Sequence, residues 1–151
     1  MRVVIQRVSK ASVVINSDEI CNIKNGLLIL LGIELKDSDE DIVWLTKKII
    51  NLRIFSDENG KMNHSIADVS GEIIVVSQFT LHAKTKKGNR PSYINAAKPE
   101  LAIPLYEKFT DFLRKESGLN VYTGKFGADM KVSLINDGPV TIILDSKEKD
   151  F

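Results

Sequence analysis

Polar side chains follow directly on a run of four aliphatic residues, Ile73 to Val76. Residues 71–83 read GEIIVVSQFTLHA, and the aliphatic part passes without a turn residue into Ser77, Gln78, Phe79 and Thr80. Alternation along a strand puts Ser77 and Phe79 on one face and Gln78 and Thr80 on the other. Such groups at a strand end can meet a ligand, or they can simply satisfy backbone groups there. Spacing alone favours neither interpretation.

Thr80 is a poor candidate for a covalent nucleophile. An activated hydroxyl needs an adjacent base, which a third group orients. The only histidine nearby in sequence is His82, and its segment offers no carboxylate to orient it. His64, in KMNHSIAD, is interpreted as a surface loop residue without a role in chemistry.

A second polar interruption is NDGPVT, residues 136–141. Taken in isolation, Gly138 and Pro139 favour an ordinary hairpin turn. A Gly-Pro bond is also one of the few that can be cis at small cost, and a cis proline is usually a functional feature.

A basic stretch follows the first polar segment. KTKKGNRPS, residues 84–92, contains Lys84, Lys86, Lys87 and Arg90 without an acidic residue. A charge run is usually a solvated loop, but beside an active site it would suit phosphate groups. Apart from Tyr93, no aromatic side chains are interleaved with these charges, so sequence-specific reading of a nucleic acid is not expected.

Composition limits the remaining possibilities. The 151 residues, 43% hydrophobic, fit one globular domain over 1–151, and 21 basic against 20 acidic residues provide no strong overall field. One cysteine, Cys21, excludes an intramolecular disulfide, and with two histidines it leaves too few ligands for a structural zinc site. We expect no metal and no cofactor.

Two hydrophobic segments bear on where the protein is located in the cell. The first residues, MRVVIQRV, have a strand pattern without a signal-peptide core, and LLILLGI is far too short to span a membrane. The sequence therefore predicts a cytosolic chain without membrane contact.

Turn signals at short intervals separate the expected elements. RVVIQRV and ASVVI read as strands, NSDE and Asn25-Gly26 as turns, and LLILLGI as a buried strand. A hairpin is expected around Asn59-Gly60. KVSLINDGPVTIILD, residues 131–145, reads as two strands around a tight connection.

Two helices interrupt these strands. Ser38 and Asp41 resemble a capping box that opens a helix through residues 41–52. The second helix is expected within 99–117, with Pro104 near its first turn and Gly118 as the stop. The pattern predicts a layered α/β fold, a strand-rich single domain whose two main helices cover one face of a sheet.

The two polar segments together resemble the D-aminoacyl-tRNA deacylase family. The likeness is carried by SQFTL at 77–81 and NDGPVT at 136–141, with GKFGADMKV at 124–132 and RVSKASV near the start. It runs the length of the chain, and its motifs follow in the family's order. The resemblance implies a homodimeric enzyme with the site at the subunit interface. Such an enzyme hydrolyses the ester that links a D-amino acid, or mischarged glycine, to tRNA.

The same resemblance implies roles for particular residues. The segment from Ser77 to Thr80 would hold the aminoacyl group, with main-chain N–H groups near Phe79 and Thr80 as an oxyanion hole. Gly138-Pro139 would be the family's Gly-cisPro motif, reaching in from the partner subunit, and Arg7 would hold that motif in place. The basic stretch would then contact acceptor-stem phosphates.

Catalysis without a nucleophilic side chain is chemically reasonable for such a substrate. An aminoacyl ester carries a vicinal ribose hydroxyl, so the protein need only position it and stabilise the developing oxyanion, a contribution of about 10²–10³ in rate for one donor. Two alternatives stay open: a small-molecule esterase with Thr80 as nucleophile, and a non-enzymatic RNA-binding module. The first leaves the basic stretch unexplained, and the second leaves both polar segments unexplained.

Overall fold

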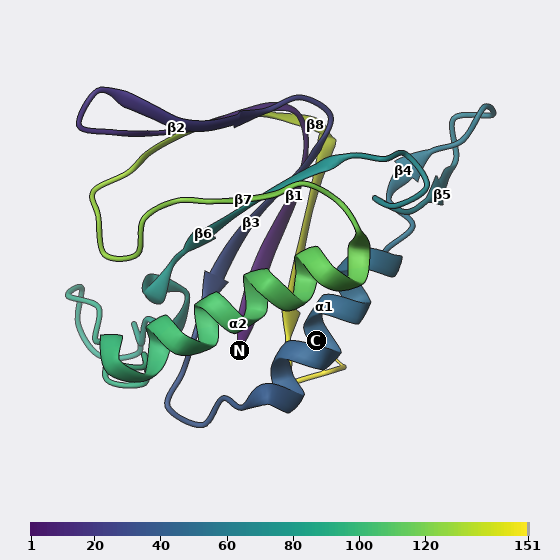
Figure 1. Cartoon of the computed structure of the whole chain (residues 1–151). Coiled ribbons are helices and arrows are strands. Elements are labelled where there is room, and N and C mark those ends of the chain that lie inside the picture. The colour runs from purple at the N-terminus through teal and green to yellow at the C-terminus, as the bar shows by residue number, and fades with distance from the viewer. Residues whose placement is uncertain (151) are drawn as a thin grey trace.

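A mixed sheet of six strands forms the body of the molecule (Figure 1). The computed structural model describes residues 1–150. Five strands follow the order β2-β1-β3-β6-β7, and β8 pairs with the other side of β1. The strands are β1 (Arg2–Ile15), β2 (Asp18–Ile23), β3 (Gly26–Gly32), β6 (Glu72–Ser77), β7 (Val121–Thr123) and β8 (Lys131–Asp145).

The centre of the sheet is a parallel pair, β3 and β6, buried on both faces. Leu27 and Ile73 belong to a core cluster on one face, whereas Leu28 and Ile74 belong to a second cluster on the other. Two-sided burial explains why the aliphatic run of β6 does not alternate with polar residues. Parallel β7 continues the same arrangement at the edge.

The long strand β1 makes the sheet curl. Its first half pairs with β3 from Arg2 to Val8, and its second half pairs with β2 from Ala11 to Ile15. RVVIQRV and ASVVI are therefore one strand rather than two. β8 lies along the other side of β1. Because Val13 and Ile23 pack in the second cluster, the far half of the sheet covers the face that no helix reaches.

Two helices, α1 (Asp39–Asn51) and α2 (Pro99–Ser117), lie on one side of the sheet (Figure 1), as the sequence predicted. α1 buries Ile42, Leu45 and Ile49 against the first cluster. Its capping box is present: the Ser38 side chain meets the backbone of Asp41, whose carboxylate accepts the Ser38 N–H at 2.8 Å.

Pro104 departs from the expectation. It is the sixth residue of α2 rather than part of its first turn. A proline there cannot donate to the carbonyl four residues earlier, that of Glu100. Glu100 is exposed, so water can satisfy this carbonyl, and the helix continues to Gly118, whose φ of 67° ends it.

Residues 131–145 also differ from the expected pair of strands. They form one strand, β8, and both halves pair with β1. The register shifts between Gln6 and Val8, opposite residues 137–140, so NDGPVT is a bulge within a strand rather than a hairpin turn. The two halves of β8 run in the same direction, because after the bulge the chain pairs again with the same strand, β1.

A small hairpin projects from the body at upper right in Figure 1. β4 (Phe55–Ser56) and β5 (Met62–His64) pair around Asn59-Gly60, as expected from the turn signal. Asp57 organises the hairpin by accepting the backbone N–H groups of Asn59 and Lys61, each at 2.9 Å. His64 is partly exposed there. Within residues 1–150, no helix is long and apolar enough to cross a bilayer.

The first turn of α1 generates a stability prediction. Burial raises the pKa of Asp41, but hydrogen bonds from Lys147, Ser146 and Ser38 outweigh it and bring this pKa to about 2. Asp41 therefore stabilises the fold above the unfolded pKa near 4, and this contribution is lost as pH falls through 2. Asp41→Asn should lower the free energy of unfolding by roughly 1–2 kcal/mol at pH 7 and by little near pH 2.

Urea denaturation at several pH values measures this effect. Glu40→Gln, in the same turn but exposed and outside the capping box, is the matched control and should change stability by less than about 0.5 kcal/mol. An Asp41→Asn deficit that is as large at pH 2 as at pH 7 would contradict the prediction.

Candidate active site

A cavity of about 270 Å³ opens where β6 ends. Ser77, Gln78 and Phe79 lie at one side of it, directly after the aliphatic part of the strand. Its other walls come from the end of β6, from β3 and the residue after it, from α2 and the residues before it, and from the segment that leads into β8; they are Leu31, Ile33, Val76, Ala97, Ala102, Phe126, Gly127, Ala128, Met130 and Val132. The cavity is thus mainly apolar, with polar groups gathered at one strand end, as in many small-molecule sites.

One cavity wall is held by a buried tyrosine. The Tyr106 hydroxyl donates to the Val75 carbonyl at 2.7 Å, and its ring packs edge-on against Phe126 at 5.9 Å. Burial raises the pKa of Tyr106, so the hydroxyl remains a neutral donor. Phe126 belongs to the segment that the resemblance drew attention to, but no spacing rule predicted that its side chain would line the cavity.

The polar segment leaves the sheet through a 3₁₀ turn, η1 (Phe79–His82). The Gln78 N–H still bonds to Leu31 as part of the sheet, at 2.7 Å, and the Leu81 N–H bonds back to Gln78 at 3.3 Å. The first N–H groups of a turn have no partner within it. The N–H groups of Phe79 and Thr80 are in this position, and within residues 1–150 they make no other backbone bond. They are free to meet a developing negative charge.

No base contacts the Thr80 hydroxyl within the described chain. Its oxygen accepts the Gln78 side-chain amide at 2.5 Å, and an amide cannot remove its proton. His82 is buried, and its Nε2 atom has no hydrogen-bond partner among residues 1–150. No orienting acid was evident near His82 in the sequence, yet Glu34 lies 4.0 Å from His82 Nδ1. Even so, this pair does not reach Thr80.

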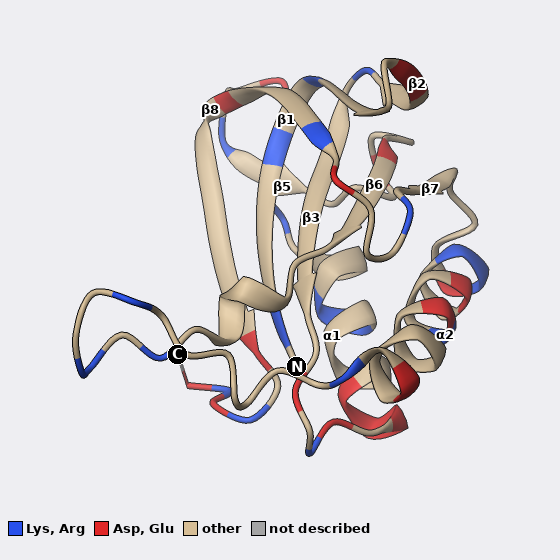
Figure 2. Cartoon of the chain, turned by 90° about the vertical axis from the view of Figure 1, so that its left-hand side faces the viewer, with Lys and Arg blue, Asp and Glu red and all other residues tan. Residues whose placement is uncertain are grey.

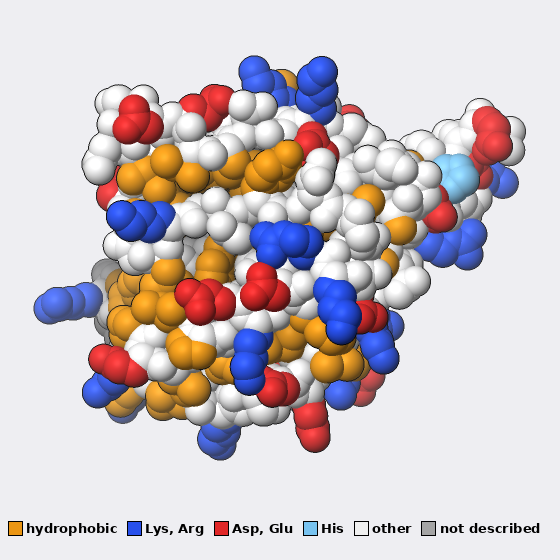
Figure 3. Space-filling view, viewed as in Figure 1, with side chains coloured by type: hydrophobic (Ala, Val, Ile, Leu, Met, Phe, Trp, Pro, Cys, Tyr) orange, Lys and Arg blue, Asp and Glu red, His pale blue; other side chains and the backbone are white. Residues whose placement is uncertain are grey.

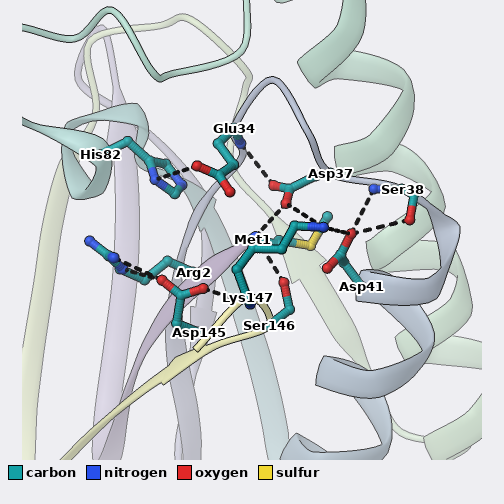
Figure 4. A network of polar contacts seen from close by, with 10 residues as sticks. All are labelled: Met1, Arg2, Glu34, Asp37, Ser38, Asp41, His82, Asp145, Ser146 and Lys147. Atoms are coloured by element: carbon teal, nitrogen blue, oxygen red, sulfur yellow. Dashed lines mark hydrogen bonds and ion pairs between the residues drawn. The ribbon is translucent and has the colours of Figure 1, made fainter. Parts of the chain in front are cut away.

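A polar network at the ends of β1 and β8 holds η1 in place (Figure 4). Arg2 donates to the Leu81 carbonyl at 2.9 Å and to the Asp145 carboxylate at 2.8 Å. Burial raises the pKa of Asp145, but hydrogen bonds from Lys147 and Arg2 outweigh it and leave this pKa below its usual value. The ends of β1 and β8 therefore hold the turn that carries the free N–H groups. Sequence reasoning did not identify Arg2 or Glu34, because both lie in segments that read as ordinary structure.

A second part of this network lies deeper (Figure 4). The Met1 amino group pairs with buried Asp37 and donates to Ser146 at 2.9 Å, and Lys147 bonds to Asp41 at 2.8 Å. The network links the start of β1 and the residues after β8 to the first turn of α1.

The NDGPVT bulge is held by Arg7, which is 9% exposed. Arg7 donates to the main-chain oxygens of Asp137 at 3.0 Å and Ile54 at 2.5 Å. Asn136 bridges the base of the bulge by donating to the Arg7 and Val140 carbonyls at 3.1 and 2.9 Å. Gly138 and Pro139 are left exposed at its tip.

Gly138 could not be replaced without disturbance. Its φ is 131°, and a Cβ atom there would lie 2.9 Å from the Arg7 guanidinium. The bond from Gly138 to Pro139 is cis, as expected from the resemblance. The close approach of Arg7 thus depends on a residue without a side chain.

Within one chain the two polar segments lie far apart. Ser77 pairs with Leu31 and Leu31 with Val3, whereas the bulge faces Arg7, four residues further along β1. Four residues span about 13 Å, and three strand spacings separate β6 from β8 by about 14 Å. One subunit therefore does not bring Gly138-Pro139 to its own Ser77.

The basic stretch forms an exposed loop beside the site (Figure 2). Two backbone hydrogen bonds between Lys84 and Ser92, at 2.8 and 3.0 Å, close its base. Within residues 1–150 none of its cations takes part in an ion pair; they are Lys84, Lys86, Lys87 and Arg90. Their charge is therefore available to an anionic ligand.

The described residues contain no group of three or more His, Cys, Asp or Glu side chains suited to a metal ion. Cys21 is buried in the second core cluster, where desolvation raises the pKa of its thiol. Neither observation adds a group to the candidate site.

Comparison with known proteins gives consistent results along the whole chain. The family model described as D-Tyr-tRNA(Tyr) deacylase matches residues 4–145. A D-aminoacyl-tRNA deacylase of Flavobacterium psychrophilum is 68% identical over 150 residues, which is 99% of this chain and 100% of that protein. One of Bacteroides fragilis is 65% identical with the same coverage.

Solved structures share the fold. One described as c-Myc DNA Unwinding Element Binding Protein superposes with a TM-score of 0.90 at 44% identity, covering 96% of this chain and 98% of that one. Another, a probable eukaryotic D-amino acid tRNA deacylase, gives 0.81 at 18% identity, covering 95% and 97%. The second likeness concerns the fold alone.

Proposed function

The chain belongs to the D-Tyr-tRNA(Tyr) deacylase family, and on this premise we propose that it hydrolyses the ester between a D-amino acid and the terminal adenosine of tRNA. The products are the free amino acid and tRNA. The observation that carries the proposal is the mainly apolar cavity at the end of β6, with the free N–H groups of Phe79 and Thr80 beside it. We assign this activity to the cytoplasm.

The main chain supplies the electrostatic part of the mechanism. As water or hydroxide attacks the ester carbonyl, negative charge develops on its oxygen, and the two N–H groups at the start of η1 stabilise it. Arg2 fixes the far end of the same turn through the Leu81 carbonyl. The donors are therefore held in place before the reaction begins, which is what makes such donors effective.

The proton transfers are assigned to the substrate. Thr80 has no base at its hydroxyl, and His82 is turned into the protein beside Glu34. The vicinal ribose hydroxyl of the terminal adenosine is next to the ester in every substrate molecule, so it can accept a proton from the attacking water and give its own proton to the leaving ribose oxygen without a catalytic side chain. Gln78 holds the Thr80 side chain, and Ser77 lines the pocket.

We assign the active species to a homodimer. The exposed tip Gly138-Pro139 cannot reach Ser77 of its own chain, but a two-fold axis would let each tip enter the other subunit's cavity. Ile135 and Ile143, which precede and follow the tip along β8, are 59% and 41% exposed and add apolar surface to this strand. A second copy would bury this surface.

The tip of the bulge also provides a means of distinguishing D from L substrates. D and L substrates differ only in where the side chain points from Cα, so attraction to the ester alone separates them poorly. Arg7 holds the bulge through the Asp137 carbonyl, and the remaining main-chain carbonyls of the tip, those of Gly138 and Pro139, form a rigid polar wall against an L side chain. Glycine has no side chain to reject, and it should therefore be accepted.

The first test concerns Thr80. Thr80→Ala should keep most of the rate, because no base activates this hydroxyl, whereas a D-aminoacyl-tRNA lacking the terminal ribose 2′-hydroxyl should not be turned over. Single-turnover deacylation measures both. A loss of more than about 10³-fold with Thr80→Ala would favour covalent catalysis.

The second test concerns the basic loop. Lys86→Gln, Lys87→Gln and Arg90→Gln together should weaken tRNA binding and reduce the slope of log K against log salt by about 0.7–0.9 for each phosphate that the loop no longer neutralises. The rate at saturating substrate should change little. The same three-charge change at Lys47, Lys48 and Lys115, exposed on the helices, is the control. Equal salt slopes for the two triple variants would show that the loop contributes no more to tRNA binding than other exposed surface does.

The third test concerns chirality and assembly. The protein should sediment as a dimer and cleave D-tyrosyl-tRNA and glycyl-tRNA, while L-tyrosyl-tRNA and a free amino-acid ester persist. The L substrate excludes an unselective esterase, and turnover itself excludes a binding module. Comparable hydrolysis of L-tyrosyl-tRNA, or full activity in a monomer, would refute the assignment.

A further inference from the structure

Two exposed aromatic rings meet beside the cavity, and one of them, Phe79, belongs to its lining. Phe79 and Tyr93 are 14 residues apart in sequence, yet their ring centroids lie 5.0 Å apart and their planes cross at 77°. The two residues are 55% and 39% exposed. Aromatic rings usually bury their surface, so a pair that leaves this much in solvent beside a cavity is available to a flat ligand.

The scaffold holds this aromatic corner, Phe79 with Tyr93, from both sides. Phe79 begins η1, and Tyr93 directly follows the pair of hydrogen bonds that joins Ser92 to Lys84. After Tyr93 the chain is fixed again, since the Leu35 N–H donates to Asn95 at 3.3 Å and the Ala96 N–H to Tyr93 at 3.0 Å. The aromatic corner is therefore preorganised, since the chain holds both rings in place before any ligand binds.

The size of the cavity determines what must remain outside it. About 270 Å³ is less than the roughly 300–1,000 Å³ of pockets that enclose drug-sized ligands. A cavity of this size suits an aminoacyl group, and we place the attached nucleoside outside it. The terminal nucleoside then lies beside Phe79, which lines the cavity, and the nucleotide before it lies beside Tyr93.

The charge beside the corner fits this ligand. The loop that ends at Tyr93 carries four cations and no acid, and aromatic rings next to a cationic groove are the usual means of binding single-stranded nucleic acid. In Figure 3, acidic and basic side chains are instead interspersed along α2, so that surface offers no comparable run of positive charge. The sequence revealed only Tyr93, because Phe79 comes close to it only after folding.

We propose that Tyr93 stacks on the penultimate base of the unpaired RNA 3′ end while Phe79 borders the terminal nucleoside. The inference rests on the proposed function and adds the site that receives the bases. Tyr93 acts in binding rather than chemistry: it holds the strand so that the terminal ester enters the cavity. Stacking tolerates any base, so the contact requires a base without selecting which.

The test uses an uncharged RNA minihelix with four unpaired 3′ nucleotides, and a second minihelix that is abasic at the penultimate position. Tyr93→Ala should weaken binding of the first by about 5- to 100-fold, the loss expected for one stacked base. The same variant should bind the abasic minihelix as wild type does, because ring and base act as one interacting pair. Tyr93→Phe should stay within about twofold of wild type on both.

Two controls separate stacking from other causes. Ile94→Ala removes an aliphatic side chain that is 71% exposed beside Tyr93, and it should change affinity less than about twofold. Sedimentation should show the same assembly state for Tyr93→Ala as for wild type. With D-tyrosyl-tRNA, Tyr93→Ala should raise KM and leave kcat within about twofold.

Three results would overturn the inference: equal losses on both minihelices, an Ile94→Ala loss as large as that of Tyr93→Ala, or a shift of Tyr93→Ala toward monomer, which would assign the corner to a second copy. The proposed function is judged separately. If wild type cleaves D-tyrosyl-tRNA while Tyr93→Ala weakens binding of both minihelices equally, the proposed function is supported and the role of the aromatic corner is refuted. If wild type does not cleave it, the function fails whatever the minihelices show.

Discussion

Burial of β3 and β6 on both faces is the constraint from which the rest of the architecture follows. From Ile73 to Val76 every side chain of β6 is buried, so polar side chains lie only at its two ends, Glu72 and Ser77. Ser77 lies at the cavity, and the 3₁₀ turn begins two residues later. The helices on one face and the curled half of the sheet on the other confine the site to this end.

Two arginines on β1 transmit the geometry of this sheet to the two functional segments. Arg2 reaches the Leu81 carbonyl, and Arg7 reaches the Asp137 carbonyl. Both arginines are charged donors to main-chain oxygens, and hydrogen bonds from a charged donor are stronger than neutral ones. Because one strand carries both anchors, the covalent geometry of β1 sets how far apart along the strand η1 and the bulge are held.

Local sequence signals predicted the elements that depend on neighbouring residues. The capping box at Ser38 and Asp41 located the start of α1, Gly118 located the end of α2, and the break from Val76 to Ser77 indicated the candidate site. The errors arose where partners are distant. NDGPVT has the composition of a hairpin turn, and only pairing of both flanks with β1 makes it a bulge. The approach of Glu34 to His82 likewise has no local signature.

The short base of the basic loop makes it a self-contained module. Two hydrogen bonds between Lys84 and Ser92 close it, so the seven residues between them can change in length, charge or flexibility without transmitting strain to η1. Exposed loops on a rigid support are where insertions are best tolerated. Related chains can therefore vary the length and charge of this loop while the cavity beside it stays the same.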